Sequence, residues 1–263
     1  IQDNDAYRYG EETLHRKYGI PTAINVGDYL IGLGYRLVSR EAAVLGPDVA
    51  SDIIDILAEA HTKLSEGQGA ELLWRDSLNK RLSPLDALKI YALKTSPAFE
   101  AAMMSGVRLA HAIGEYREPV KVFARNLGVA FQILNDLIDW HGDDFNKMSA
   151  GGDTLGGRPT VLLALALERL ESDEQEELLS LVENEQLSAQ QRLARVKELY
   201  TKADVFETAY RLVDKHQQRA ELVADEIQPE DLRRLMYFLV DTVLERPSTD
   251  EAATEPVQID QDA

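Results

Sequence analysis

Oxygen-bearing side chains follow one face of a predicted helix near the middle of the chain. Within residues 131–143, Asn135, Asp139 and Asp143 are spaced four residues apart, and Gln132 falls between them in helical angle. Most other residues of this helix are apolar, and a buried carboxylate must be paired, protonated or metal-bound. Oxygen-only ligands suit a hard cation such as Mg²⁺, which takes one or two carboxylates plus substrate phosphates. The alternative is a solvated or salt-bridged stripe that binds no ligand.

Two cationic side chains stand beside predicted breaks in the helical pattern. Lys94 comes just before Pro97, and this proline predicts a kink near Thr95 that frees backbone carbonyls. Arg158 follows the glycine-rich loop 150–157, and such loops at helix starts offer N–H groups to anions. We therefore expect Arg158 to face an anionic ligand and Lys94 to have a functional role beside the kink, although each residue type is also common on ordinary surfaces.

The elements that must position these groups are helices. Apolar residues recur every three or four positions, strand-like alternation is missing, and Ser83-Pro84 forms a helix-start signal. The sequence therefore predicts an all-α protein. The expected helices cover residues 21–38, 48–75, 84–94, 98–113, 119–141, 160–170, 173–183, 189–200, 203–225 and 229–245.

Composition limits the function further. The chain has 263 residues with 46 acidic and 28 basic side chains, and its charge of −18 argues against binding nucleic acid or anionic membranes by bulk electrostatics. It has no cysteine, and its longest apolar run is far below the ~20 residues of a membrane span. We expect a cytoplasmic protein without an integral membrane segment, made of one helical domain (1–247) and an acidic disordered tail (248–263).

Several motifs, in the right order, together resemble the trans-isoprenyl diphosphate synthases, the polyprenyl synthetase family. Residues 128–139, with Gly142-Asp143, Gly152-Asp153 and Arg158-Pro159-Thr160 after them, resemble its second aspartate-rich region. The other matches are Lys94-Thr95-Ser96 to its Lys-Thr-Ala/Gly kink, residues 23–30 to Ala-Ile-Asn-x-Gly-Asp-x-Leu, and residues 1–10 to the end of Asp-Asp-x-x-Asp with the following Arg-Arg-Gly. The resemblance covers about residues 1–170.

The resemblance implies the isoprenoid synthase fold, a helical bundle around a central cavity, assembled as a homodimer. It implies that an allylic diphosphate is ionised with the help of three Mg²⁺ ions and joined to isopentenyl diphosphate. It also assigns roles by similarity: metal binding to Asp3, Asn135, Asp136 and Asp139, diphosphate binding to Arg8, Lys94 and Arg158, and contact with the allylic cation to Gln132 and the carbonyl of Thr95.

Three residues depart from the family pattern. Tyr9 replaces the second arginine of Arg-Arg-Gly, Asn135 replaces an aspartate, and Ser149 stands where lysine is usual. The leading pair of aspartates in the first motif would precede Ile1, so we expect the front helices of the fold to be absent. Tyr9 and Asn135 favour two alternatives: a class I terpene cyclase of the same fold, and a non-catalytic regulatory subunit of a prenyl diphosphate synthase. The remaining close match to chain-elongating members favours the transferase.

Overall fold

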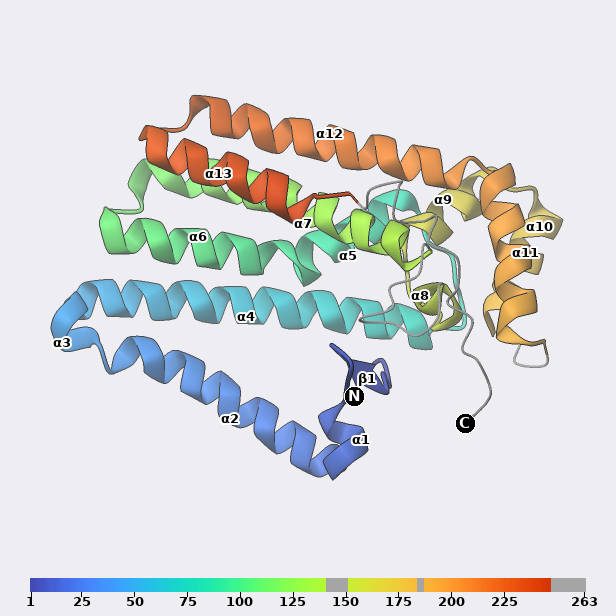
Figure 1. Cartoon of the computed structure of the whole chain (residues 1–263), viewed down its shortest axis with the longest axis horizontal. Coiled ribbons are helices and arrows are strands. Elements are labelled where there is room, and N and C mark those ends of the chain that lie inside the picture. Colours follow the sequence, from blue (N-terminus) through green and yellow to red (C-terminus); the bar gives the residue numbers. More distant parts are fainter. Residues whose placement is uncertain (141–150, 184–186, 247–263) are drawn as a thin grey trace, which may run out of the picture.

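Long helices lie side by side along the long axis of the molecule (Figure 1). In the computed structural model, which describes residues 1–140, 151–183 and 187–246, α4 packs against α6, α6 against α7, and α7 against α12. α2 covers the outer side of α4, and α13 lies on α12. These six helices are α2 (Ile20–Ser39), α4 (Pro47–Asp76), α6 (Ser96–Ala110), α7 (Arg117–Asp139), α12 (Val205–Glu226) and α13 (Glu230–Val243).

Shorter elements complete the described part of the chain, and most of them gather at one end of the long helices (Figure 1). The all-α prediction is confirmed, and the boundaries of most expected helices agree to within three residues. These elements are β1 (Tyr7–Arg8), β2 (Glu11–Glu12), α1 (Leu14–Tyr18), α3 (Ala42–Leu45), α5 (Pro84–Lys94), the 3-10 helix η1 (Gly114–Tyr116), α8 (Gly152–Leu155), α9 (Val161–Arg169), α10 (Ser172–Glu183) and α11 (Ala189–Lys202).

The helix that carries the predicted aspartate stripe lies at the centre of the core. α7 contacts α6 on one side and α12 on the other, so apolar residues around most of its circumference are removed from water. A helix held on two sides keeps its polar groups in fixed positions. Its fully buried apolar side chains are Val120, Phe123, Leu127, Ala130, Ile133, Leu134 and Leu137.

The break before Pro97 occurs where the sequence predicts it. The Ser83 hydroxyl caps the start of α5 by accepting the Asp86 N–H. The helix ends at Lys94, and the next residue, Thr95, has a non-helical φ of −125°. The Thr95 carbonyl accepts the Ala98 N–H at 3.2 Å, so a new turn begins at the start of α6 with this carbonyl as its acceptor. Its predicted position facing an allylic cation stays a prediction.

A glycine lets α4 approach this break closely. A Cβ atom on Gly67 would lie 2.5 Å from the Lys94 nitrogen and 2.6 Å from the Leu93 carbonyl carbon, which is too close for any side chain. Gly67→Ala should therefore push α5 away and lower the free energy of unfolding by about 1–3 kcal/mol, measured by urea denaturation. Gly69→Ala, with open space around it, should instead raise stability by about 0.5–1 kcal/mol. Equal effects of the two changes would contradict the close approach.

A small hairpin near the start of the chain was not predicted. β1 and β2 pair antiparallel, with Tyr7 opposite Glu12 and Arg8 opposite Glu11. The connecting residues Tyr9 and Gly10 have φ angles of 52° and 76°, the left-handed pair that a tight two-residue hairpin turn requires. Strands of two residues are too short to produce a recognisable alternation of apolar and polar side chains.

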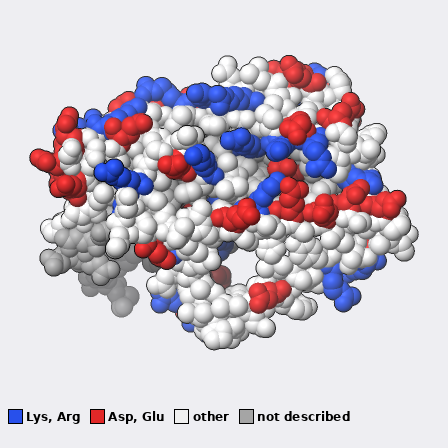
Figure 2. Space-filling model, turned by 180° about the vertical axis from the view of Figure 1, so that it is seen from behind, with Lys and Arg blue, Asp and Glu red and all other residues white. Residues whose placement is uncertain are grey.

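Both signs of charge occur on the face seen in Figure 2. There, basic and acidic side chains form short runs that lie next to one another, and neither sign covers the whole face. None of the helices in the described ranges has the length and apolar character needed to cross a bilayer. The predicted tail 248–263 and the positions of Asp143 and Ser149 lie outside the described residues.

Candidate functional site

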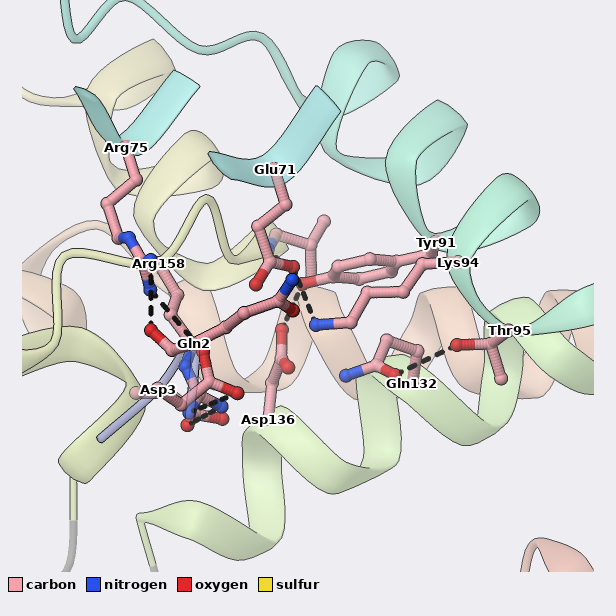
Figure 3. Close-up of polar contacts among 12 residues, drawn as sticks. Gln2, Asp3, Glu71, Arg75, Tyr91, Lys94, Thr95, Gln132, Asp136 and Arg158 are labelled. Carbon is pink, nitrogen blue, oxygen red and sulfur yellow. Dashed lines mark hydrogen bonds and ion pairs between the residues drawn. The ribbon is translucent and has the colours of Figure 1, made fainter. Parts of the chain in front are cut away.

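Charged side chains from three helices, the N-terminal segment and the loop after α8 meet at the end of α4 (Figure 3). We call them the charged cluster. It contains no cation without a carboxylate partner, so an anionic ligand would have to compete with internal carboxylates or arrive with its own cations. Its members are Asp3, Glu71, Arg75, Lys94, Asp153 and Arg158.

Lys94 and Glu71 form the most buried ion pair of the charged cluster. Lys94 Nζ lies 2.7 Å from Glu71 Oε2, and the Glu71 side chain is only 5% exposed. The second oxygen, Glu71 Oε1, is buried and has no hydrogen-bond partner in the described part of the chain. A buried carboxylate oxygen without a donor is costly. This oxygen therefore has unused capacity to accept a further donor or to bind a cation.

Two arginines hold Asp3. Arg75 Nη1 lies 3.4 Å from Asp3 Oδ1, Arg75 also donates to the Gln2 carbonyl at 3.0 Å, and Arg158 Nη2 lies 3.3 Å from Asp3 Oδ2. Arg158 also pairs with Asp153 at 2.5 Å. Burial lowers the pKa of Arg158, but Asp153 and Asp3 outweigh burial and raise this pKa overall. Arg158 therefore links the N-terminal segment to the segment that contains α8.

Asp139 fixes that same segment from the other side. The Asp139 side chain is buried, and its Oδ2 accepts the Asp153 backbone N–H at 3.0 Å. The Asp139 carbonyl also accepts the Gly151 N–H at 2.8 Å. The glycine-rich loop, which was expected to be irregular, thus contains the short helix α8, whose first turn is held at the end of α7.

Gln132 and Thr95, whose side chain and carbonyl respectively were predicted to face an allylic cation, lie together. Thr95 Oγ1 donates to Gln132 Oε1 at 3.1 Å, which joins the kink to α7. Gln132 is partly exposed, whereas its neighbours Ile133 and Leu134 are buried in the core. The structure therefore brings Gln132 and Thr95 together through the threonine hydroxyl rather than through its carbonyl.

An apolar pocket lies beside α6, the helix that follows the kink after Lys94. It measures about 390 Å³ and lies between α2, α4 and α6. Ala98, four residues after Lys94, is the lining residue of α6 nearest in sequence to the charged cluster. The pocket therefore lies along the helix that continues beyond the kink. Its other lining residues are Leu30, Ile31, Gly34, Tyr35, Leu57, Ala60, His61, Leu64, Ala101 and Ala102.

Not all predicted ligands come together. Arg8 lies on the exposed hairpin with its guanidinium over the Tyr9 ring, and no contact with the charged cluster is found among the described residues. Asn135 is half-buried on α7. In the arrangement seen here, Asp3, Asp136 and Asp139 do not converge into a group of three metal ligands, and within the described ranges no other trio of acidic or histidine side chains does so. Arginines hold Asp3 in this structure.

The donor chemistry still suits a hard divalent cation. The nearby side chains offer carboxylate oxygens, and Glu71 Oε1 is a buried oxygen with unused capacity. To bind a metal cation, Asp3 and Asp153 would have to give up their ion pairs with arginine. The residues present thus fit Mg²⁺ by chemical type.

The Polyprenyl synthetase family model matches residues 1–202 of the chain. The chain belongs to this family. Among curated relatives, the polyprenyl synthetase chain is 32% identical to the short chain isoprenyl diphosphate synthase of Methanocaldococcus jannaschii, over 70% of this chain and 55% of that protein. It thus spans about half the length of that relative.

Solved structures share the fold of this polyprenyl synthetase chain. The geranylgeranyl pyrophosphate synthetase of Pyrococcus horikoshii Ot3 superposes with a TM-score of 0.82 at 22% identity, over 93% of this chain and 73% of that chain. The polyprenyl synthase of Caulobacter crescentus CB15, complexed with calcium and isoprenyl diphosphate, gives a TM-score of 0.78 at 25% identity, over 93% and 72% of the two chains. The predicted isoprenoid synthase fold is confirmed.

Sequence reasoning missed four residues that the structure brings to the site. Glu71 and Arg75 are four residues apart and share a face of α4, and Tyr91 precedes Lys94 by three residues on α5. These spacings were a usable signal once Lys94 had been selected. Asp153 was noted as part of a motif, without a role of its own. Its ion pair with Arg158 depends on the fold of the loop between them and could be found only in the structure.

Proposed function

We propose that this chain is a prenyltransferase that joins an allylic diphosphate to isopentenyl diphosphate after magnesium-assisted ionisation of the allylic substrate. The observation that carries the proposal is the position of Lys94, which belongs to the charged cluster and ends α5 directly before α6, the helix that lines the apolar pocket with Ala98, Ala101 and Ala102. A diphosphate with a hydrocarbon tail likewise combines a charged group, which suits the charged cluster, with an apolar chain, which suits the pocket. The names of the relatives, isoprenyl diphosphate synthases, support this choice over the two alternatives.

The residues divide the work by charge. Lys94 and Arg158 would bind the diphosphate and stabilise the negative charge that develops on its oxygen as the C–O bond breaks and its electron pair leaves with the diphosphate. Asp3 and Asp139, with Asn135, would hold Mg²⁺, and the ion when bound would offset the charge of the diphosphate. The pocket volume of about 390 Å³ falls in the usual range of roughly 300–1,000 Å³ for small-ligand sites.

Two further elements of the proposal concern the allylic group and the assembly. Gln132 is oriented by the Thr95 hydroxyl and would present its amide near the allylic carbon that becomes positive. The homodimer stays a prediction, with the expected interface on α2 and α4. It is supported by large apolar side chains that α2 leaves exposed, namely Ile20, Ile24, Tyr29, Leu30, Ile31, Leu33 and Leu37.

Product analysis tests the function directly. The protein is incubated with Mg²⁺ and labelled isopentenyl diphosphate, with and without an allylic diphosphate. Longer labelled diphosphates are expected only when the allylic substrate and Mg²⁺ are both present, and a chelator should abolish them. A released hydrocarbon or alcohol would point to the cyclase alternative, and lack of turnover of either substrate would point to the regulatory subunit.

A further inference from the structure

Tyr91 is buried where three elements of the site meet. Its ring lies on α5 and is 3% exposed, and its hydroxyl reaches Asp136 of α7 and Val161 at the start of α9. Asp136 and Val161 are themselves 2% and 0% exposed. Figure 3 shows the Tyr91 ring running from α5 toward the Asp136 carboxylate. This phenol is therefore enclosed by protein groups.

Both hydrogen-bonding functions of the phenol oxygen are used. The Tyr91 O–H donates to Asp136 Oδ2 in a short bond, and the oxygen accepts the Val161 N–H at 2.7 Å. A phenol has one proton, so the direction of both bonds is fixed. Burial raises the pKa of Tyr91 well above its ordinary value, and the Asp136 carboxylate raises it further. The hydroxyl therefore remains a donor throughout the physiological pH range.

The three elements joined in this way carry groups that we assign to the diphosphate and to Mg²⁺. Lys94 lies one turn after Tyr91 on α5, Asp139 lies one turn after Asp136 on α7, and Arg158 precedes Val161 by three residues. A shift of any one element would move its charged group relative to the others. The Tyr91 oxygen on α5 is thus hydrogen-bonded to both α7 and the start of α9, the two elements whose charged groups must keep their positions relative to Lys94.

We propose that Tyr91 is a positioning residue that acts through Asp136 and the start of α9 to hold Lys94, Asp139 and Arg158 in register. Asp136 then serves as a hydrogen-bond acceptor for Tyr91 rather than as a ligand of Mg²⁺, the role that the sequence resemblance implied. The inference rests on the proposed function, because the groups held in register are those assigned to the diphosphate (Lys94 and Arg158) and to Mg²⁺ (Asp139).

A second tyrosine supplies a matched control. Tyr237 on α13 donates to Asp225 Oδ1 of α12 at 2.6 Å, so it makes the same pair of groups between two other helices. Neither residue belongs to the charged cluster or lines the apolar pocket. Tyr91→Phe and Tyr237→Phe therefore each remove a hydroxyl that donates to an aspartate, in one case from a buried pair at the site and in the other from an exposed pair away from it.

The test combines a readout without turnover and one with turnover. Calorimetric titration with Mg²⁺ in the presence of inorganic pyrophosphate should give an affinity about 10–100-fold lower for Tyr91→Phe than for the wild type, and kcat should fall by a similar factor. Hydrogen exchange at the Val161 amide should accelerate, because its acceptor is gone. Tyr237→Phe should leave all three unchanged. Unchanged Mg²⁺ affinity and kcat in a folded Tyr91→Phe protein would overturn the proposal.

Substitutions of Asp136 keep the test decisive if Tyr91→Phe does not fold. Asp136→Asn retains an oxygen that can accept the Tyr91 hydroxyl, whereas Asp136→Ala does not. Positioning predicts that the asparagine variant keeps at least about tenfold more Mg²⁺–pyrophosphate affinity than the alanine variant. Equal losses in both variants would return Asp136 to the role of a metal ligand and refute the inference.

The outcomes also separate this inference from the proposed function. If the wild type forms no prenyl product but Tyr91→Phe still lowers the affinity for Mg²⁺ and pyrophosphate, the function fails and the positioning role stands. If the wild type elongates the allylic substrate and Tyr91→Phe does so equally well, only the positioning role fails.

Discussion

Asp139→Asn is expected to lower prenyl transfer by about a thousandfold. The carboxylate at this position is proposed to hold Mg²⁺, and loss of several kcal/mol of charge stabilisation corresponds to about three decades in rate. The fold should survive, because the asparagine oxygen can still accept the Asp153 N–H that Asp139 Oδ2 accepts at 3.0 Å. The measurement is kcat at saturating Mg²⁺, together with calorimetric Mg²⁺ binding in the presence of pyrophosphate.

The matched control for this substitution is Asp52→Asn near the other end of α4. It removes an ion pair with Arg108 of 2.6 Å and leaves the charged cluster untouched, so turnover should stay at the wild-type level. Near-normal turnover of Asp139→Asn would contradict the metal-binding role. It would leave Asp139 as the residue that holds α8 at the end of α7.

Lys94→Gln should reduce both turnover and stability, for two separable reasons. Loss of a cation from the diphosphate site is expected to lower kcat by about 10²–10³-fold. The same change leaves Glu71 as a buried carboxylate without its partner at 2.7 Å, and breaking such a pair costs about 3 kcal/mol of unfolding free energy. Urea denaturation measures the second effect independently of the first.

The double change Lys94→Gln with Glu71→Gln separates the two effects. It removes both buried charges, so most of the lost stability should return while turnover stays low. Lys89→Gln is the control on the same helix, because Lys89 pairs with Asp86 at the exposed face and should affect neither quantity strongly. If the double variant regained turnover along with stability, Lys94 would have only a structural role.

Local signals in the sequence were sufficient to predict the helices and several site residues. Ser83-Pro84 marked the start of α5, Pro97 marked the break after Lys94, and the three- and four-residue spacing of apolar side chains marked α7 as a core helix. Each of these signals acts within one or two turns of the same helix. Proline removes a donor without fixing which donors the neighbouring carbonyls find, so the bond from the Ala98 N–H to the Thr95 carbonyl became visible only in the structure.

Family motifs identified residue types but not their partners. They pointed to Lys94, Arg158 and Asp139, and the family they indicated is the one to which the chain belongs. They also placed Arg8 in the same site, whereas the hairpin turn at Tyr9 and Gly10 leaves Arg8 on the surface. A motif fixes the order of residues along the chain, and the path of the backbone decides which of them can meet.

The sequence by itself determined an all-α chain with an aspartate stripe on a buried helix and two cations beside helix breaks. Only the tertiary structure decided how these charges are paired. Glu71 meets Lys94 across 23 residues, Tyr91 meets Asp136 across 45, and Asp3 meets Arg75 across 72. Helical periodicity relates residues three or four positions apart, whereas pairing between elements depends on how whole helices pack. The partners that control each charge are therefore set by the packing of α4, α5 and α7.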